Sequence, residues 1–420
     1  MDKLLITGGQ SLQGTVNISG AKKSAVALLA AALLAEEPVT LENLPVIADV
    51  LIQIKILEEL GVKVEWQKKN QLLIDPSNVL KEMIVPYALA KKLRGSSLFL
   101  GAILAKNGKA IVPLPSTNSG DMQSIDLHLK GMRALGVALE LEQGYLIADG
   151  SNMQGTKIYL DYPSIGATMN ILLAATRAPG TTIIENCAKD PEVIDLVSFL
   201  NSIGANIRGA GTDIIRIKSS SYFTGNICYS CIPDRLEAST FLIAAGITRG
   251  RVRLENVIPL HLQATVSKLR EIGVRIDEGE NWIQADGTKG KLIAVDLKTL
   301  PYPGFPTDLF SPMVSLVATI NGTSTITDSV IKKTYPIIAE LNRMGAQIKE
   351  EDRIVIVRGE KNLSGTQVRA QDMRGCAGLI LAALAATGVS QITEVNHLQR
   401  GYEDFVSKLE QLGASIIEYT

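Results

Sequence analysis

The stretch ILEELGVKVEW at 56–66 reads as the end of an amphipathic helix, a glycine and a strand of alternating character. The same phrase returns five more times: GMRALGVALEL at 131–141, FLNSIGANIRG at 199–209, KLREIGVRIDE at 268–278, ELNRMGAQIKE at 340–350 and KLEQLGASIIE at 408–418. The six glycines are Gly61, Gly136, Gly204, Gly273, Gly345 and Gly413, so successive copies lie 68 to 75 residues apart. Such regular spacing indicates an internal repeat rather than chance alternation of helices and strands.

A second, alanine-rich helix is predicted about half a repeat before each glycine. Its copies are AVALLAAALLAEEP at 25–38, SSLFLGAILAKNG at 96–108, ATMNILLAATRAPG at 167–180, ASTFLIAAGITRG at 238–250, FSPMVSLVATINGT at 310–323 and CAGLILAALAATG at 376–388. They are apolar on nearly every side, which is typical of helices inside a domain. Most end at Gly or Asn-Gly, a common helix stop, and a strand follows. Each unit therefore reads strand, helix, strand, helix, strand, strand, and we expect helices inside and sheets outside.

Composition excludes several classes of protein. The formal net charge is −1, so the chain lacks the basic excess expected of a nucleic-acid-binding protein. The apolar run AVALLAAALLA at 25–35 is shorter than the ~20 residues that cross a membrane, and the first residues do not resemble a signal peptide. We therefore expect no nucleic-acid partner, no membrane contact and a cytoplasmic location.

The four cysteines are Cys187, Cys228, Cys231 and Cys376. Cys228 and Cys231 form a C-x-x-C, a spacing found in zinc and redox sites. A structural zinc site needs four ligands, and no second pair follows at a suitable distance. The surrounding NICYSCIPD alternates like a strand, so we expect both side chains to be buried, with no metal, in a reducing compartment.

Several motifs along the whole chain resemble the enolpyruvyl transferases. They are GGQSLQGTVNISGAK at 8–22, DYPSIGAT at 161–168, IPDRLEASTF at 232–241, PGFPTD at 303–308, DMRGCAGLILAAL at 372–384 and LQRGYEDF at 398–405. The branch of the family that acts on shikimate 3-phosphate would be expected to begin with P-G-S-K-S. Here S-G-A-K favours the branch that acts on a nucleotide sugar.

The resemblance implies a two-domain inside-out α/β barrel of six βαβαββ repeats, with the active site in the interdomain cleft. The expected first domain is 22–232, which carries the lid and the nucleotide contacts, and the second is 1–21 plus 233–420. The implied activity transfers the enolpyruvyl group of phosphoenolpyruvate to the 3'-hydroxyl of UDP-N-acetylglucosamine in peptidoglycan precursor synthesis. It needs no metal or organic cofactor. The cleft is expected to close around the substrates, and the chain is expected to be a monomer.

The same resemblance assigns residues to phosphoenolpyruvate, whose phosphate and carboxylate require several fixed cations. The implied ligands are Lys22, Lys23, Arg94, Arg374 and Arg400. Lys22 also opens a predicted helix, where backbone N–H groups favour anions. Without the motifs, each would be read as a solvated surface side chain.

Asp308 matches the carboxylate that contacts the acceptor hydroxyl, which makes it the candidate general base beside Lys22. Read alone, an aspartate after Pro-Thr would be a helix N-cap. The implied contacts of the nucleotide sugar are Arg94, Gln123, Ser124, Ile125, Asp126, Leu127, His128, Pro163, Ser164, Ile165, Gly166, Asp308 and Val330. His128 by itself would more often be structural.

The segment PLPSTNSGDMQ at 113–123 matches the mobile lid of the family but departs from its chemistry. The family lid carries a Cys that acts on the substrate carbon and an Arg that binds phosphate. Asn118 and Gln123 occupy those two positions, and Asn cannot donate a proton as a carboxyl can. We hypothesise that Asp121 supplies the acid and Lys23 the missing charge. Two alternatives stay open: an enolpyruvyl transferase with a different nucleotide or nucleotide-sugar acceptor, and a non-catalytic ligand-binding paralogue.

Overall fold

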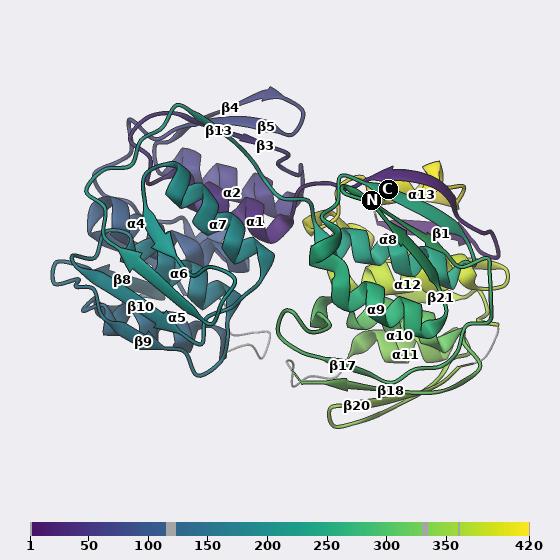
Figure 1. The fold of residues 1–420 in the computed structure, drawn as a ribbon. Helices are drawn as coiled ribbons and strands as arrows, with labels where there is room; N and C mark the ends of the chain where they lie inside the picture. Colours follow the sequence, from purple (N-terminus) through teal and green to yellow (C-terminus); the bar gives the residue numbers. More distant parts are fainter. Residues whose placement is uncertain (1, 115–122, 330–334, 360–361, 420) are drawn as a thin grey trace. The chain divides into compact units, whose positions relative to one another are not determined.

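The structure is a computed structural model that describes residues 2–114, 123–329, 335–359 and 362–419. The chain forms two compact units. Unit 1 comprises Met1–Ser19 and Pro233–Thr420, and unit 2 comprises Gly20–Ile232. Each unit is built from the same repeated arrangement of helices and sheets (Figure 1).

Unit 2 contains three central helices, α1 (Lys22–Ala32), α4 (Leu98–Asn107) and α6 (Ile165–Ala175). Its outer helices are α2 (Ala48–Glu59), α5 (Gln123–Ala134) and α7 (Pro191–Ser202), with short α3 (Tyr87–Ala90) and 3₁₀ η1 (Arg94–Ser97). Its first sheet contains β13 (Ile227–Ser230), β3 (Val39–Glu42), β5 (Gln71–Asp75) and β4 (Lys63–Lys68), in that order. The second contains β6 (Lys109–Pro113), β8 (Tyr145–Asp149) and β7 (Ala138–Glu142). The third contains β9 (Lys157–Tyr159), β10 (Thr181–Glu185), β12 (Ile214–Lys218) and β11 (Asn206–Arg208).

Unit 1 repeats this plan around α8 (Arg235–Ile247), α10 (Phe310–Ala318) and α12 (Met373–Ala385). Its outer helices are α9 (Gln263–Ile272), α11 (Pro336–Arg343) and α13 (Phe405–Gln411), with 3₁₀ turns η3 (Pro259–Leu262), η4 (Thr307–Leu309) and η5 (Val395–Arg400). One sheet contains β2 (Gln13–Asn17), β14 (Arg251–Glu255), β16 (Trp282–Asp286) and β15 (Arg275–Glu278). The next contains β17 (Leu297–Thr299), β18 (Gly322–Asp328), β20 (Ile354–Gly359) and β19 (Gln347–Glu351). The last contains β21 (Gln367–Arg369), β22 (Val389–Thr393), β1 (Lys3–Thr7) and β23 (Ser415–Tyr419).

All the four-stranded sheets share one topology. In the sheet of β9 to β12, β9 is parallel to β10, β10 is antiparallel to β12, and β12 is antiparallel to β11. Three strands reach their sheets from distant parts of the sequence. β1 pairs with β22 and β23, β2 with β14, and β13 with β3. Some sheets are therefore completed by a strand from another repeat, and the repeat pattern in the sequence does not reveal this pairing.

Helices lie inside each unit and sheets lie outside (Figure 1). The alanine-rich segments form the central helices, and α1, α6, α8 and α12 bury nearly all their side chains. Small alanine side chains allow helices to approach closely on several sides, whereas the amphipathic outer helices bury one face. The predicted inside-out α/β repeat fold is confirmed.

Two local predictions need correction. The second repeat lacks a full first strand in the described chain, because pairing with β6 is limited to an isolated bridge from Ile84 to Ile111. Pro86, two residues after Ile84, is the N-cap of α3, and proline has no backbone N–H with which to extend a ladder. Cys228 is exposed rather than buried, whereas Cys231 is buried. The two residues are three positions apart, so an extended chain points them to opposite faces.

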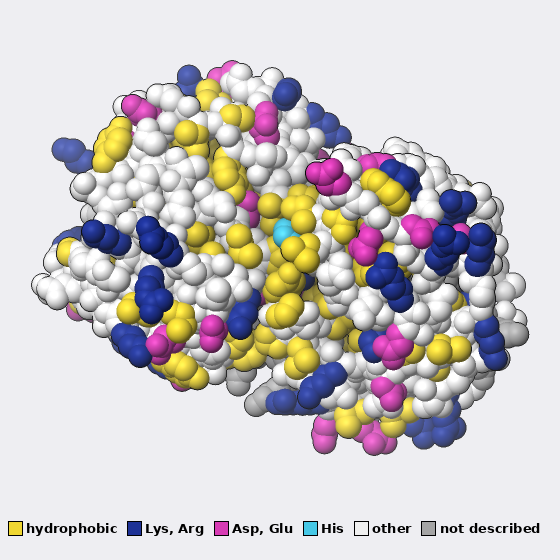
Figure 2. All heavy atoms as spheres, viewed as in Figure 1, with side chains coloured by type: hydrophobic (Ala, Val, Ile, Leu, Met, Phe, Trp, Pro, Cys, Tyr) yellow, Lys and Arg dark blue, Asp and Glu magenta, His cyan; other side chains and the backbone are white. Residues whose placement is uncertain are grey.

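The surface carries both signs of charge. Figure 2 shows basic and acidic side chains interspersed over the face drawn. Within the described residues, no helix is long and apolar enough to span a membrane.

Candidate functional site

The start of α1 is set by a close backbone approach. A Cβ atom on Gly20 would lie 1.7 Å from the carbonyl oxygen of Asn43, so only glycine fits there. Ala21 then donates its backbone N–H to the carbonyl of Ile232 at 2.7 Å. These contacts explain the S-G-A-K motif, because they place Lys22 as the first residue of α1.

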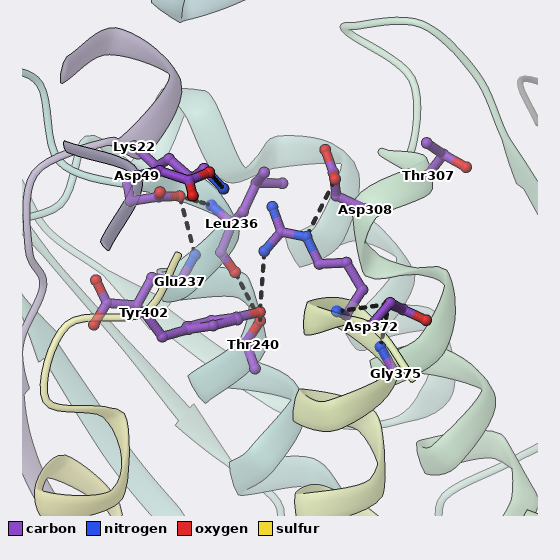
Figure 3. A network of polar contacts seen from close by, with 12 residues as sticks. Lys22, Asp49, Leu236, Glu237, Thr240, Thr307, Asp308, Asp372, Gly375 and Tyr402 are labelled. Carbon is purple, nitrogen blue, oxygen red and sulfur yellow. Dashed lines mark hydrogen bonds and ion pairs between the residues drawn. The ribbon is translucent and has the colours of Figure 1, made fainter. Parts of the chain in front are cut away.

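Lys22 is held by a buried carboxylate. Its Nζ lies 2.6 Å from Oδ2 of Asp49, the second residue of α2, in the pair drawn in Figure 3. The side chain of Asp49 is 2 % exposed and that of Lys22 is 19 % exposed. Lys23, the next residue, is half-buried. The start of α1 therefore presents a partly accessible cation whose position is set by α2.

The start of α12 is organised by the D-M-R-G motif. Oδ1 of Asp372 accepts hydrogen bonds from the backbone N–H groups of Arg374 and Gly375, both at 2.9 Å. A Cβ atom on Gly375 would come within 3.1 Å of the Asp372 carboxylate, so glycine leaves room for this cap. Asp372 is thus the N-cap of α12 and directs Arg374 from its first turn.

The guanidinium of Arg374 lies in a polar network within unit 1. Its Nε donates to Oδ1 of Asp308 at 3.2 Å, and Nη1 donates to the hydroxyl of Tyr402 at 3.2 Å. Tyr402 in turn lies 3.0 Å from Oγ1 of Thr240, which donates to the carbonyl of Leu236 at 2.8 Å. Figure 3 shows the labelled members of this network converging from α8, η4, α12 and the segment after η5.

The directions of these bonds follow from Leu236. Because its carbonyl can only accept, Thr240 donates to it and accepts from Tyr402, whose oxygen accepts from Arg374. Burial acts to lower the pKa of Arg374, but Asp308, Tyr402 and Asp234 together outweigh it, and the net pKa is raised. Burial raises the pKa of Tyr402. The network therefore holds a charged guanidinium and a neutral phenol.

Asp308 lies in η4, and its side chain is 26 % exposed. The preceding Thr307 donates to Oδ2 of Asp328 at 2.8 Å, and Thr299 donates to Oδ1 of the same carboxylate at 2.6 Å. These bonds fasten η4 to β17 and β18. The simple N-cap interpretation of Asp308 is wrong, because Leu309 is the N-cap of α10 and Asp308 contacts Arg374 instead.

Two further predicted arginines lie in 3₁₀ turns. Arg400 is the last residue of η5 and is half-buried. Arg94 is the first residue of η1, but its side chain lies outside the described part of the structure. Arg400 is two residues from Tyr402 in the L-Q-R-G-Y motif, so this motif also supplies the network of Arg374.

The predicted nucleotide contacts in unit 2 gather at the start of α6. Ser164 is the N-cap, and its Oγ accepts from the backbone N–H of Ala167 at 3.3 Å. A Cβ on Gly166 would lie 3.2 Å from Nε2 of His128, so the imidazole packs against this turn. Pro163 and Ile165 are half-buried beside it. The structure thus brings α5 and the P-S-I-G turn together.

On α5, His128 is buried, Ile125 and Leu127 are half-buried, and Asp126 is exposed. His128 Nδ1 lies 2.8 Å from Nδ2 of Asn170 on α6. Both residues line a small pocket in unit 2. Its lining is Ser97, Leu100, Val112, Pro113, Leu114, Ile125, His128, Leu146 and Asn170.

Several predicted residues cannot be placed. Asn118, Asp121 and Val330 lie outside the described residues. Gln123 and Ser124 belong to α5, but their side chains are also outside the described part. In the described ranges, no cluster of three or more His, Cys, Asp or Glu side chains is arranged to hold a metal ion.

Sequence reasoning missed Asp49, Tyr402 and Asn170. Tyr402 lies inside a motif that was recognised, and a tyrosine two residues after a candidate ligand was the available signal. Asp49 is 27 positions after Lys22, and Asn170 is 42 positions after His128, as their numbers show. No local pattern connects such pairs, because α2 and α6 meet their partners only in the folded units.

Comparison with protein families gives a match over residues 6–409 to the EPSP synthase family, described as 3-phosphoshikimate 1-carboxyvinyltransferase. Among curated proteins, the chain is 47 % identical over 417 residues to a UDP-N-acetylglucosamine 1-carboxyvinyltransferase 2 of Geobacillus kaustophilus, covering 99 % of this chain and 96 % of that protein. It is 42 % identical over 416 residues to a UDP-N-acetylglucosamine 1-carboxyvinyltransferase 1 of Carboxydothermus hydrogenoformans, covering 99 % and 98 %.

Solved structures show the same fold. The enolpyruvyl transferase NikO from Streptomyces tendae superposes with a TM-score of 0.90 at 28 % identity, covering 99 % of this chain and 98 % of that one. An EPSP synthase from Acinetobacter baumannii superposes over 100 % of both chains with a TM-score of 0.79. Its 16 % identity supports likeness of fold alone.

Proposed function

Because the chain belongs to the EPSP synthase family of enolpyruvyl transferases, we propose that it transfers the enolpyruvyl group of phosphoenolpyruvate to the 3'-hydroxyl of UDP-N-acetylglucosamine. The observation that carries this proposal is the 47 % identity, over 99 % of the chain, to a relative named for that reaction. The reaction releases inorganic phosphate and belongs to peptidoglycan precursor synthesis.

We assign the cations by the shape of the anion that each suits. Lys22, with Lys23 and Arg94, binds the phosphate of phosphoenolpyruvate, because an ammonium at a helix start adds to the backbone N–H groups there. Arg374 and Arg400 bind the carboxylate, for which a planar guanidinium offers two parallel N–H donors. The bonds from Arg374 to Asp308 and Tyr402 support this role, because they restrict its rotation before substrate binds.

Asp308 is the proposed general base. The acceptor hydroxyl adds to C2 of phosphoenolpyruvate and gives its proton to Asp308, while C3 receives a proton from an acid. The tetrahedral adduct then loses a proton from C3 to a base and phosphate from C2, which restores the double bond. The pairing of Asp308 with Arg374 supports the role of general base, because a neighbouring guanidinium favours the ionised carboxylate that can accept a proton.

The nucleotide half of the acceptor is assigned to α5 and the start of α6. His128, Ser164, Ile165 and Gly166 bind the diphosphate, with Pro163 beside them. The remaining proposed contacts are Arg94, Gln123, Ser124, Ile125, Asp126, Leu127, Asp308 and Val330. The packing of His128 against Gly166 supports a common role for α5 and the P-S-I-G turn.

The acid is assigned to Asp121, since Asn118 at the position of the lid cysteine cannot donate a proton. The matched variants are Asp121→Ala and Asn118→Ala. We expect Asp121→Ala to abolish turnover and Asn118→Ala to retain it. Full activity of Asp121→Ala would remove this assignment without touching the overall reaction.

The test of the function is phosphate release from purified protein with phosphoenolpyruvate and UDP-N-acetylglucosamine, with mass detection of the enolpyruvyl product. We expect product in the wild type and none in Lys22→Ala. Lys109→Ala is the control, because its side chain is 70 % exposed and pairs with Asp149 on the outer sheet. Release of phosphate without the mass of the product would reject the transfer.

A changed acceptor is the second candidate, favoured by the altered acceptor wall, where the sequence has Thr334 in place of the family's arginine, and by the retained Arg374 and Arg400. The replacement of both lid residues, at Asn118 and Gln123, instead favours a non-catalytic ligand-binding protein. A changed acceptor predicts binding of phosphoenolpyruvate but no turnover with UDP-N-acetylglucosamine, and turnover with another nucleotide or nucleotide sugar. Tight nucleotide-sugar binding without turnover on any acceptor would instead indicate a non-catalytic ligand-binding protein. Titration of the two ligands separately distinguishes these outcomes.

We further propose that the chain acts as a cytoplasmic monomer without nucleic-acid partners. Its near-neutral formal charge supports the absence of a nucleic-acid partner. Size-exclusion chromatography with light scattering checks the oligomeric state directly: a mass near 45.1 kDa is expected, and a mass near twice that value would reject the monomer.

A further inference from the structure

The side-chain amide of Asn170 makes three hydrogen-bond contacts in the interior of unit 2. Its Oδ1 accepts from the backbone N–H of Gly101 at 2.7 Å, and its Nδ2 donates to the carbonyl of Ser97 at 2.9 Å. Nδ2 also lies 2.8 Å from Nδ1 of His128. Asn170 is fully buried, so all three groups are shielded from water.

The two backbone partners determine which way the amide faces. A backbone N–H can only donate, so the atom beside Gly101 must be the oxygen; a backbone carbonyl can only accept, so the atom beside Ser97 must be the nitrogen. Swapping oxygen and nitrogen would break both bonds, so hydrogen-bond chemistry alone fixes the orientation. The second hydrogen of Nδ2 is therefore the one beside His128.

This orientation selects one form of the imidazole. A hydrogen on Nδ1 would meet the amide hydrogen of Asn170, so Nδ1 must be the bare acceptor and Nε2 must carry the proton. Nε2 is also the ring nitrogen beside the turn that begins α6, since a Cβ on Gly166 would lie 3.2 Å from it. The buried amide thus places an N–H donor at the P-S-I-G turn.

We propose that Asn170 is a positioning residue that holds His128 as the neutral Nε2–H tautomer, so that Nε2 donates to an oxygen of the acceptor's diphosphate. The inference rests on the proposed function, which assigns the diphosphate to this turn. The ligand that this arrangement suits is an oxygen-rich anion, to which the neutral Nε2–H group of His128 donates. Asn170 touches no substrate itself and acts through the tautomer of His128.

Long-range proton–nitrogen NMR spectra of the ¹⁵N-labelled protein test the tautomer without any substitution. The chain has three histidines, and His128→Gln identifies the relevant signals. We expect the nitrogen shifts of a bare Nδ1 and a protonated Nε2 in the wild type. A protonated Nδ1 would overturn the assignment. Asn170→Asp replaces the donor beside Nδ1 by an acceptor, so it should move the proton to Nδ1.

Binding of UDP measured by calorimetry tests the link to the ligand. Asn170→Ala should weaken binding about threefold to tenfold, the worth of one hydrogen bond. The same variant should leave kcat within about twofold at saturating acceptor, because only ground-state orientation is lost.

The matched control is Ser315→Ala in unit 1. Ser315 is also fully buried on a central helix, and its Oγ donates across to the carbonyl of Gly378 at 2.8 Å. It should lose stability but keep the wild-type affinity for UDP. If Asn170→Ala binds UDP as tightly as the wild type, the positioning role is rejected and the proposed function stands. If the wild type itself does not bind UDP, the assignment of the diphosphate to this turn is rejected with it, and phosphate release decides the proposed function separately.

Discussion

Each unit begins a central helix with a candidate cation, but the two helix starts differ. Lys22 is the first residue of α1, and the N-cap before it is Ala21, whose methyl group cannot accept a hydrogen bond. Arg374 follows the first residue of α12, where Asp372 already accepts from two backbone N–H groups. An anion bound at the start of α1 can accept hydrogen bonds from backbone N–H groups and also pair with the charge of Lys22. An anion bound at the start of α12 must receive its hydrogen bonds from the side chain of Arg374.

The contacts that restrain the side chains of Lys22 and Arg374 also differ. Lys22 forms an ion pair with Asp49, and an ammonium can rotate about its stem while keeping such a contact. Arg374 bonds through different nitrogens to Asp308 and Tyr402, which constrains both the position and the plane of the guanidinium. A phosphate requires positive charge and several hydrogen-bond donors, whereas a carboxylate requires two parallel donors in one plane. The contrast is the physical basis for assigning phosphate to α1 and carboxylate to α12.

The largest expected effect is at α1. Lys22→Met should lower kcat/KM by about 100-fold to 1,000-fold, the loss typical of one fixed electrostatic donor in an active site. It also leaves Asp49 buried without this partner, so unfolding free energy should fall by about 3–5 kcal/mol. The double variant Lys22→Met with Asp49→Asn should regain stability but not activity, as read by thermal unfolding and phosphate release. Recovered activity in the double variant would contradict the role of Lys22.

At α12, charge alone should not suffice. Arg374→Lys keeps the charge but cannot contact Asp308 and Tyr402 through two separate nitrogens, so kcat/KM for phosphoenolpyruvate should fall about 10-fold to 100-fold. Arg343→Lys on the surface of unit 1, where the arginine is 60 % exposed, is the control and should change nothing. Equal activity of Arg374→Lys and wild type would remove the distinction between the two helix starts.

The cap of α12 should matter mainly for stability. Asp372→Ala removes the acceptor of two backbone N–H groups and should cost about 1 kcal/mol. For a unit of this size, that corresponds to a melting temperature lower by about 2–4 °C. Asp372→Ser restores a capping oxygen and should recover most of the loss, as calorimetry can show. If Asp372→Ser does not recover the stability, the missing cap is not what destabilises Asp372→Ala.

Adding a cap to α1 is the reverse experiment. Ala21→Ser would offer an oxygen to the same N–H groups that we assign to phosphate, in backbone geometry suited to an N-cap. We expect KM for phosphoenolpyruvate to rise about twofold to tenfold, since a hydrogen bond to the substrate is replaced by an internal one. Steady-state kinetics measure this. An unchanged KM together with higher stability would show that the α1 N–H groups do not bind phosphate.

The smallest expected effect is on the pKa of a carboxylate in an outer turn, and we expect the same kind of effect in the two units. Hydrogen bonds from Ser151 lower the pKa of Asp149 in unit 2 to about 2, and the hydroxyl of Thr288 lowers the pKa of Asp286 in unit 1. A carboxylate with a depressed pKa stabilises the fold above its ordinary pKa of 3.8, and this contribution is lost as pH falls toward 2. Ser151→Ala should return the pKa of Asp149 toward 3.8 in an NMR titration. An unmoved titration would show that Ser151 does not cause the depressed pKa.

The repeat architecture could be predicted because its signals are local. The glycine after each amphipathic helix and the alanine-rich run before it lie within a few turns of the elements they specify. The helix caps Asp372 and Ser164 also belong to motifs visible in the sequence. Motifs around Lys22, Arg374 and Asp308 identified candidate ligands from their immediate neighbours in the same way.

Other features depend on how distant segments meet. The strands β1, β2 and β13 complete sheets of other repeats. Asp49 pairs with Lys22, Tyr402 with Arg374, and Asn170 with His128 only because the packing of separate segments brings them together. Periodicity specifies an element and its buried face, but the partner of a buried polar group is chosen by tertiary packing, where an unpaired group is costly.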